Sequence, residues 1–313
     1  MRSASENVPR ILCAGITVLD MVFCVDQIPP LDGKVECTEF FMVNGGCAAN
    51  AALAIARLGG RAMLAGPLGG PAGKDGNGDR VLAALAREAI DTSGCQRIDG
   101  LSTGLSSIFI DARGHRTIVT YRDERIALVK PRDPRALIEG ADLVLVDNRF
   151  PQFVRPICEE ARGRELRIVL DADKATVEDD PLFQIATHVV FSAECLTATT
   201  QQRDLAEGLW AMGRRTNAFV AVSNGPNDIL FLEGDSMRRA PVFDVRAVDT
   251  LGAGDALHGG FALALAEGQS EAAALRFGAA VASLKCTRLG GSAGTPRRAE
   301  VEALLAEAWS PDQ

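Results

Sequence analysis

Histidine is scarce in this 313-residue chain, which has only three, and none of its eight cysteines forms a Cys-x-x-Cys pair. A zinc site is therefore not expected, because zinc ligands are closely spaced Cys and His. No Asn-x-Ser/Thr acceptor, no apolar run of membrane-span length and no signal-peptide pattern is present. These absences predict a cytoplasmic protein with reduced thiols and no membrane partner.

Positive charge is also limited, since the formal net charge is −8. A nucleic-acid partner is not expected, and any phosphate site must be made locally. The content of 47% hydrophobic and 24% charged residues is typical of a globular protein with a sizeable core. The length allows one large α/β domain with an appendage, or two domains; we predict a single domain over residues 1–313.

Apolar runs and helical patterns alternate along most of the chain. From residue 143 onward, strands and helices of regular length follow one another, which predicts a parallel sheet covered by helices on both faces. The predicted strands are 11–15, 64–68, 143–147, 167–171, 188–191 and 219–223, and a strand end is expected at 245–248. The predicted helices are 48–58, 81–89 (capped by Asp79), 153–162, 201–214, 254–266, 270–285 and about 297–308.

Two β-rich excursions, at 20–43 and 103–122, leave this alternation and return to it. Turn residues separate short strands within each excursion, a pattern typical of exposed hairpins. We predict that the excursions pair with each other as a small sheet that acts as a lid. Ligands of open α/β sheets bind at the carboxyl ends of the strands, so the lid is expected above that edge.

The stretch 249–255, with the sequence D-T-L-G-A-G-D, is the centre of the functional prediction. A turn of small residues that opens a helix leaves backbone N–H groups unpaired at the positive end of the helix dipole, where they can hold a phosphate. Asp255 beside such amides can take a proton from an attacking hydroxyl, or it can simply cap the helix. The residues alone leave both interpretations open.

The same stretch resembles the D-T-x-G-A-G-D signature of the ribokinase (PfkB) family of sugar kinases. The resemblance implies a ribokinase-like fold and ATP-dependent phosphorylation of a sugar hydroxyl with Mg²⁺. It makes Asp255 the general base and assigns the amides of Gly252, Ala253 and Gly254 to the transferring phosphoryl group.

Two further segments match the family on the sugar side. The segment 44–50, with Gly45, Gly46 and Asn50, resembles the motif in which paired glycines admit the sugar and the Asn contacts a hydroxyl. A turn with a capping residue is the simpler alternative. Asp20 follows Gly15 as in the family's Gly-x-x-x-x-Asp, where the Asp accepts hydrogen bonds from the substrate; an ordinary loop Asp is the alternative.

Nucleotide and cation contacts are implied by weaker matches. Ser223 and Gly225 resemble a strand-end Ser/Thr-x-Gly beside the nucleotide phosphates, and Thr250 belongs to the same predicted site. The C-terminal segment 285–296 resembles the loop whose carbonyl oxygens, with Asp249, hold a monovalent cation in many relatives, and the candidate residues are Asp249, Lys285, Arg288 and Gly290. The family's Asn-x-x-Glu magnesium motif is reduced to Ser192-Ala193-Glu194-Cys195, so relocated or water-mediated Mg²⁺ contacts are expected.

The branch that the chain resembles most is that of the sulfofructose kinases. Lys34 and Arg149 match a Lys and an Arg that bind the sulfonate in that branch, whereas Thr120 stands where the branch has an Asn. Two cations in one pocket suit an anionic sugar. On residue statistics alone, both are more often solvated surface charges, so an acidic sugar, a sulfosugar and an ordinary ketose all stay open.

The resulting prediction is an ATP- and Mg²⁺-dependent carbohydrate kinase, with K⁺ as a candidate activator. Two alternatives stay open, namely a nucleoside kinase of the same family and a catalytically weak sugar- or nucleotide-binding protein on the same fold. An oxidoreductase is disfavoured because no Gly-x-Gly-x-x-Gly follows the first strand. Since exposed sheet edges pair readily, a homodimer through the lid is a further expectation.

Overall fold

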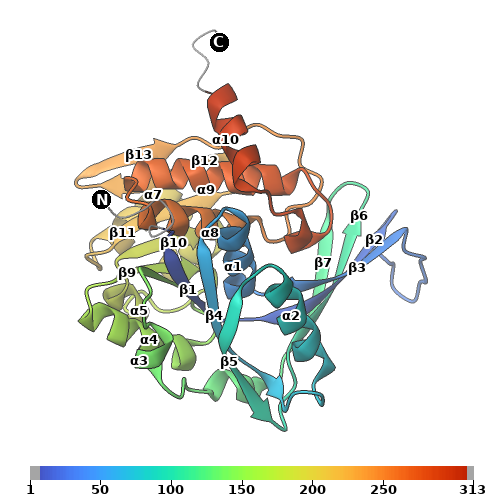
Figure 1. Ribbon diagram of the computed structural model, residues 1–313. Helices are drawn as coiled ribbons and strands as arrows, with labels where there is room; N and C mark the ends of the chain where they lie inside the picture. Colours follow the sequence, from blue (N-terminus) through green and yellow to red (C-terminus); the bar gives the residue numbers. More distant parts are fainter. Residues whose placement is uncertain (1–7, 309–313) are drawn as a thin grey trace.

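A nine-stranded sheet forms the centre of the protein in a computed structural model that describes residues 8–308 (Figure 1). All neighbouring strands run parallel except at one edge, where β12 is antiparallel to both β11 and β13. In spatial order the strands are β13 (Ser236–Ala240), β12 (Asn227–Glu233), β11 (Phe219–Asn224), β10 (His188–Ser192), β9 (Arg167–Ala172), β8 (Leu143–Asp147), β1 (Arg10–Ala14), β4 (Arg61–Gly70) and β5 (Asp91–Asp99).

Helices cover both faces of this sheet, because successive residues of one buried strand point to opposite sides. In β1, Ile11 and Cys13 belong to one apolar cluster, while Leu12 and Ala14 belong to the other. The first cluster is covered by α1 (Cys47–Arg57), α2 (Gly76–Arg87), α8 (Ala253–Ala266), α9 (Glu271–Cys286) and α10 (Arg298–Glu307). The second is covered by α3 (Pro134–Leu137), α4 (Pro151–Gly163), α5 (Pro181–Ile185), α6 (Ala193–Thr200) and α7 (Leu205–Gly213). The doubly wound α/β prediction is confirmed.

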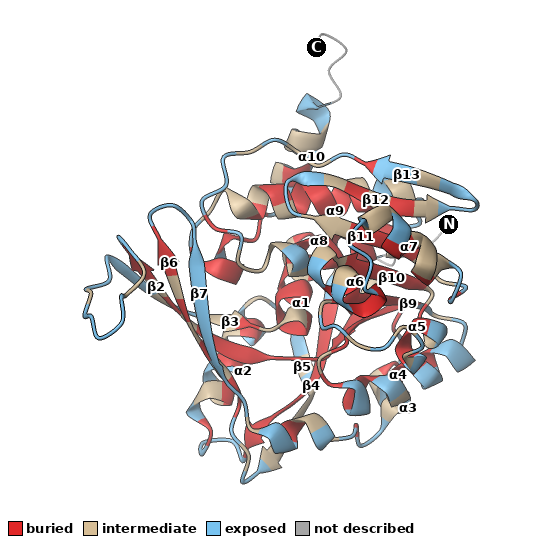
Figure 2. Ribbon diagram, turned by 180° about the vertical axis from the view of Figure 1, so that it is seen from behind, coloured by how far each residue is buried: buried red, intermediate tan, exposed pale blue. Residues whose placement is uncertain are grey.

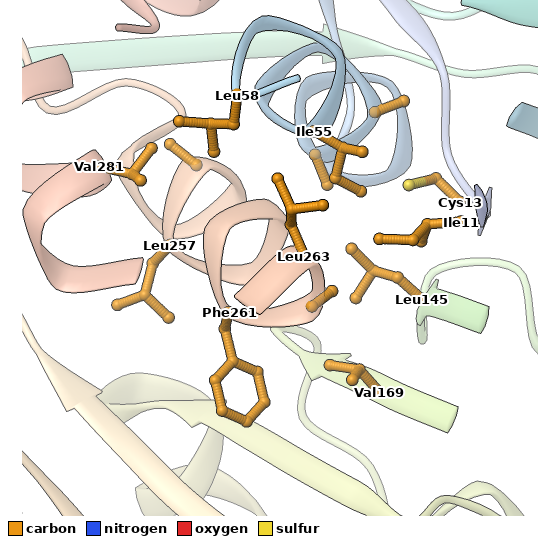
Figure 3. Packing of buried hydrophobic residues seen from close by; sticks show 14 of the residues in the cluster. Ile11, Cys13, Ile55, Leu58, Leu145, Val169, Leu257, Phe261, Leu263 and Val281 are labelled. Atoms are coloured by element: carbon orange, nitrogen blue, oxygen red, sulfur yellow. The ribbon is translucent and has the colours of Figure 1, made fainter. Parts of the chain in front are cut away.

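Helix α8 is buried between the sheet and its neighbours α1 and α9 (Figure 3). Leu263 lies between Ile55 of α1 and Leu145 of β8, whereas the Phe261 ring points away from them, toward the rings of His188 and Phe219. A Cβ at Gly259 would lie 2.7 Å from the carbonyl oxygen of Ala51, so glycine allows α8 to pack directly against α1. This packing fixes the start of α8.

A separate four-stranded sheet projects to one side of the molecule (Figures 1 and 2). Its strands, in order, are β3 (Glu39–Gly45), β2 (Val18–Val25), β6 (Leu105–Asp111) and β7 (Arg116–Tyr121). β2 pairs parallel to β6 and antiparallel to β3, whereas β6 and β7 form an antiparallel hairpin. The apolar side chains of one face, including Val22 and Ile108, pack with Leu251 of the 249–255 turn. We call this four-stranded element the small sheet.

Several local predictions are corrected by the structure. β5 and the β12–β13 hairpin were not predicted, and residues 245–248, expected as a strand end, form no regular element. The helix predicted at 201–214 begins only at Leu205, because Asp204 caps it; α6, which precedes it, was missed. Asp75, and not Asp79, caps α2 by accepting a hydrogen bond from the Gly78 amide at 3.1 Å.

Candidate active site

The 249–255 turn is held from behind by the side chain of its first residue. Asp249 is 3% exposed, and its carboxylate accepts hydrogen bonds from the amides of Leu251 (2.8 Å), Gly290 (3.1 Å) and Gly291 (2.7 Å). Gly252 then takes a left-handed conformation with φ of 77°, which glycine adopts without strain. The turn therefore has a single conformation before any ligand binds.

Three backbone amides at the start of α8 are free for an anion. Within residues 8–308, no acceptor pairs with the N–H groups of Gly252, Gly254 and Asp255. The amide of Ala253, which was expected to join them, donates instead to the carbonyl oxygen of Thr250 at 3.2 Å. Of the three amides expected to face the phosphoryl group, those of Gly252 and Gly254 are therefore unpaired, whereas the tight turn uses the Ala253 amide internally.

Asp255 lies in the first turn of α8 and is held by Asn50, which comes from the other predicted motif. The Asn50 side-chain amide donates to the Asp255 carboxylate at 2.7 Å, across 205 residues of sequence. Burial raises the pKa of Asp255, and the hydrogen bond from Asn50 opposes that rise. The two predicted motifs thus meet at one carboxylate.

The small sheet contributes a row of polar side chains to the same region. Asp20 of β2 lies beside Ser106 of β6, and Ser106 lies opposite Thr120 of β7, so all three point to the same face. Burial raises the pKa of Asp20 to about 6; the Ser106 hydroxyl opposes this shift, and the charge of Asp255 adds to it. Asp20 and Asp255 are therefore electrostatic neighbours.

The predicted glycines leave space beside this row. A Cβ on Gly45 would lie between 2.1 and 2.5 Å from the Asp20 carboxylate, and a Cβ on Gly46 would lie 2.4 Å from the carbonyl oxygen of Ile16. Gly46 also has a positive φ of 93°. Any side chain at these positions would displace Asp20 or the backbone next to it.

Carboxylates at the ends of β8 and β9 were missed as site residues. Asp147 is the last residue of β8, Asp171 is the penultimate residue of β9, and Asp173 directly follows β9; Asp147 and Asp171 are buried. Single ligand atoms of Asp171, Asp255 and Cys47 all lie within 4.8 Å of one another. The pKa of Asp171 is raised by burial and then by the charges of Asp255, Asp173 and Asp147. The signal that could have revealed them is their place directly after buried strands, at the carboxyl edge.

Two further groups pack against Asp255, the partly exposed Cys47 and the buried His258. Burial, followed by the surrounding negative charges, raises the pKa of Cys47, which favours the neutral thiol. His258, one turn after Asp255, contacts the carbonyl oxygen of Gly254 through Nδ1 (2.7 Å) and that of Val190 through Nε2 (3.2 Å). It fixes the first turn of α8 against β10.

Two arginines approach this cluster, although only one of them was predicted. Arg149 pairs with Asp173, and the pKa of its guanidinium is raised above its ordinary value by that carboxylate, against the effect of burial. Arg122, the residue after β7, was missed because no local pattern marks it. Its pKa is lowered by desolvation and then by the positive charge of Arg149. Lys34, in contrast, lies in the exposed segment between β2 and β3 and contacts no other described residue through its ammonium.

The predicted nucleotide and cation residues occupy different surroundings. Ser223 is the penultimate residue of β11, and Gly225 lies in the turn directly after the strand, with φ of 56°. The Thr250 hydroxyl accepts a hydrogen bond from Arg116 of the small sheet at 2.6 Å.

Of the candidate cation ligands, Gly290 donates to Asp249, while Arg288 pairs with Glu300 of α10. Lys285 is fully buried, with its ammonium 2.7 Å from the Asp249 carbonyl oxygen. The cation was expected at the carbonyl oxygens of this loop and at Asp249; the Lys285 ammonium is a donor and places a positive charge beside the same Asp249.

Comparison with known proteins identifies the family of this chain. The model of the pfkB family of carbohydrate kinases matches residues 8–298. The chain belongs to that family. It is 29% identical to a ribokinase of Bacillus subtilis over 300 residues, which cover 95% of this chain and 99% of the relative. It is 26% identical to mouse ketohexokinase, covering 88% of this chain and 96% of the relative.

A solved structure from Agrobacterium tumefaciens, named as a candidate ribokinase, superposes on this kinase with a TM-score of 0.92. The identity is 38%, over 97% of this chain and 100% of the other. The recognition of the ribokinase/PfkB family and of a ribokinase-like fold is thereby confirmed. The chain is an ATP-dependent sugar kinase of this family.

A pocket of about 420 Å³ lies away from the 249–255 turn and is lined by residues such as Gly213, Phe219, Leu232 and Ser270. Phe219 begins β11, so this pocket is at the opposite edge of the sheet from Asp171 and Asp255. A much smaller hollow is lined by Cys47, Asp147 and Asp171. No described helix is long and apolar enough to span a bilayer.

Proposed function

We propose that this kinase transfers the γ-phosphoryl group of ATP to a terminal hydroxyl of a small sugar or sugar derivative, with Asp255 as general base. The observation that carries the proposal is the position of Asp255, which Asn50 holds beside three unpaired amides. A base and an anion hole so placed serve the two needs of phosphoryl transfer, namely proton removal and stabilisation of charge.

The chemistry follows from the positions of these groups. The sugar hydroxyl is oriented by Asp20 and Asn50, and its oxygen forms a bond to the γ-phosphorus while the bond to the ADP oxygen breaks. The hydroxyl proton passes to Asp255, whose raised pKa makes it a better base than an exposed Asp. The amides of Gly252, Gly254 and Asp255 hold the equatorial oxygens. Thr250, Ser223 and Gly225 are proposed nucleotide contacts.

Magnesium is proposed as the companion of ATP. The donor set fits this ion, because Asp171 and Asp173 offer hard carboxylate oxygens next to Asp255, and the crowding of negative charge raises the pKa of Asp171. These two residues would hold Mg²⁺ in place of the reduced family motif, where Glu194 is exposed. Bound Mg²⁺ neutralises charge on the nucleotide phosphates.

An anionic sugar derivative is the proposed substrate class. Arg149 lies close enough to Arg122 for its positive charge to lower the pKa of Arg122. An anionic group bound between the two guanidinium groups would relieve this repulsion. Lys34 remains a candidate third cation, in the segment between β2 and β3. Thr120, on the row with Asp20, offers one hydroxyl to the same ligand.

The test is a panel assay of ADP release with ATP and Mg²⁺ over neutral pentoses, ketohexoses, sugar acids, sulfosugars and nucleosides. We expect phosphorylation of an anionic sugar, and a selective rise in its KM in Arg122→Ala. A nucleoside as the best substrate would favour the alternative kinase activity. Absence of ADP release with every acceptor would favour a binding protein instead.

A cytoplasmic homodimer is proposed as the working form. The outer face of the small sheet carries stacked aromatic rings, with Phe23 4.9 Å from Phe40 and 5.4 Å from Phe109 between centroids. Phe40 is 47% exposed and Val119 61%. A second copy would cover this apolar face through a two-fold contact. Sedimentation should show a dimer that Phe40→Asp dissociates; a monomer at every concentration contradicts this.

A further inference from the structure

The side chain of Lys285 is fully buried in the protein. Lys285 is the penultimate residue of α9, and its side chain is 0% exposed, whereas the other four lysines of the chain are all exposed. Lysine is almost never fully buried unless it is paired, because removing an ammonium from water is unfavourable. The position of Lys285 therefore calls for a partner that compensates its charge.

That partner is Asp249, the first residue of the catalytic turn. The Lys285 ammonium donates to the backbone carbonyl of Asp249 at 2.7 Å and lies 3.4 Å from its carboxylate. The same carboxylate accepts from the amides of Gly290 and Gly291, so it links the turn, the end of α9 and the following loop. One buried positive charge thus lies directly behind the anion hole.

A free monovalent cation does not fit beside this ammonium. The oxygens of Asp249 that could bind it already accept from N–H donors of Leu251, Lys285, Gly290 and Gly291. The loop carbonyl oxygens of Lys285 and Gly290 accept from the amides of Arg288 and Ala293. A second positive charge would also be repelled by the ammonium at this short range. The K⁺ that the family resemblance implied is therefore not expected here.

We propose that Lys285 is a tethered monovalent cation, which orders the 249–255 turn and makes phosphoryl transfer independent of added K⁺. The inference rests on the proposed phosphoryl transfer at Asp255. Lys285 acts through the turn and touches neither the sugar nor ATP, so it is a positioning residue. The charge that a relative would take from solution is supplied here by the chain itself.

The first test needs no variant. Turnover by the wild-type enzyme is measured in KCl, NaCl and choline chloride at equal ionic strength, about 100 mM, so that screening is the same. We expect equal rates in the three salts. A wild-type rate that depends on K⁺ overturns the inference, even though it leaves the proposed kinase activity intact.

The second test removes the ammonium. Lys285→Ala in choline chloride should lose kcat on the order of 100-fold, the effect of losing one oxyanion-hole donor, with a smaller change in sugar KM. Ammonium or potassium chloride should raise the kcat of this variant at least about tenfold, because either ion can enter the vacated space and pair with Asp249. Lys130→Ala, which removes an exposed lysine, is the matched control and should behave as wild type. Equal kcat in both variants overturns the inference.

A thermal readout separates this inference from the choice of substrate. The unfolding temperature of Lys285→Ala should be higher in ammonium or potassium chloride than in choline chloride, whereas that of the wild type should not change. If Lys285→Ala does not fold in choline chloride, Lys285→Met is measured in the same salts. A variant that folds equally in all salts overturns the inference, whether or not any sugar is phosphorylated. Absence of sugar phosphorylation by the wild type would refute only the proposed function.

Discussion

The catalytic turn and the small sheet contribute to one site in contrasting ways. The turn is seven consecutive residues, locked by Asp249 and seated on the buried helix α8. The small sheet instead brings together Asp20, Ser106 and Thr120 through pairing between strands far apart in sequence. In the proposed function, the groups for the reaction come from a short local segment, whereas the groups for substrate recognition come together only through long-range pairing. Changes in the turn should therefore affect kcat, and changes in the small sheet should affect KM.

Asp255→Asn should give the largest effect. An unchanged kcat in this variant would contradict the assignment of the reaction chemistry to the 249–255 turn. We expect kcat to fall on the order of 10²- to 10⁴-fold, because the hydroxyl loses its general base. Binding of ATP and sugar, measured by calorimetry, should stay close to wild type, since Asn keeps the shape of the side chain. Turnover near the wild-type rate would remove Asp255 from the mechanism.

Asp20→Asn should raise sugar KM while stabilising the fold. Burial raises the pKa of Asp20 from 3.8 to about 6, so the folded chain holds this proton more tightly than the unfolded chain. The stabilising contribution of this carboxyl is therefore present below about pH 4 and lost as the pH rises through about 6. At pH 8 the variant should gain up to about 3 kcal/mol in unfolding free energy, measured by denaturant titration.

The same residue predicts a pH profile. The wild-type kcat/KM should fall as the pH drops below about 6, since a protonated Asp20 loses acceptor capacity, and the variant should show a flatter acid limb. An unchanged acid limb together with an unchanged KM would show that Asp20 does not contact the sugar.

Arg116→Ala probes the contact between the two regions. Arg116 of β7 donates to the Thr250 hydroxyl at 2.6 Å, and its side chain is exposed, so we expect only about a threefold fall in kcat. Thr250→Val removes the other partner. In a double-mutant cycle the two effects should not add, whereas additive effects would show that the contact contributes nothing in solution.

Thr120→Ala should have the smallest effect, about a twofold to threefold rise in sugar KM for one lost hydrogen bond at an exposed position. Thr117→Ala is the matched control, because Thr117 pairs with Phe109 on the outer face of the small sheet. Equal effects of the two substitutions would mean that Thr120 does not face the substrate.

The contrast between the two regions also explains which parts of the candidate site could be predicted from the sequence. The 249–255 turn, the glycine pair and Asp20 were predictable because each occupies a continuous motif. Arg122 was missed because its proximity to Arg149 arises only after β7 pairs with β6. The edge strand β5 was missed because it is largely polar and only part-buried, and so lacks the apolar run of the central strands. The Ala253 amide was misassigned because a motif does not show which N–H group the turn itself uses.

The short connections of the small sheet have a mechanical consequence. Only residues 15–17 separate β1 from β2, and Gly46 alone separates β3 from α1, which carries Asn50. Gly15 and Gly46 have positive φ and no room for a Cβ, so two short junctions without side chains connect β2 and β3 to the rest of the protein, while residues 100–104 and 122–123 connect β6 and β7. In the proposed function, a tilt of the sheet would be transmitted through Gly46 to the first turn of α1. Sugar binding and alignment of Asp255 would then be one coordinated movement, which a loop inserted at either glycine should uncouple.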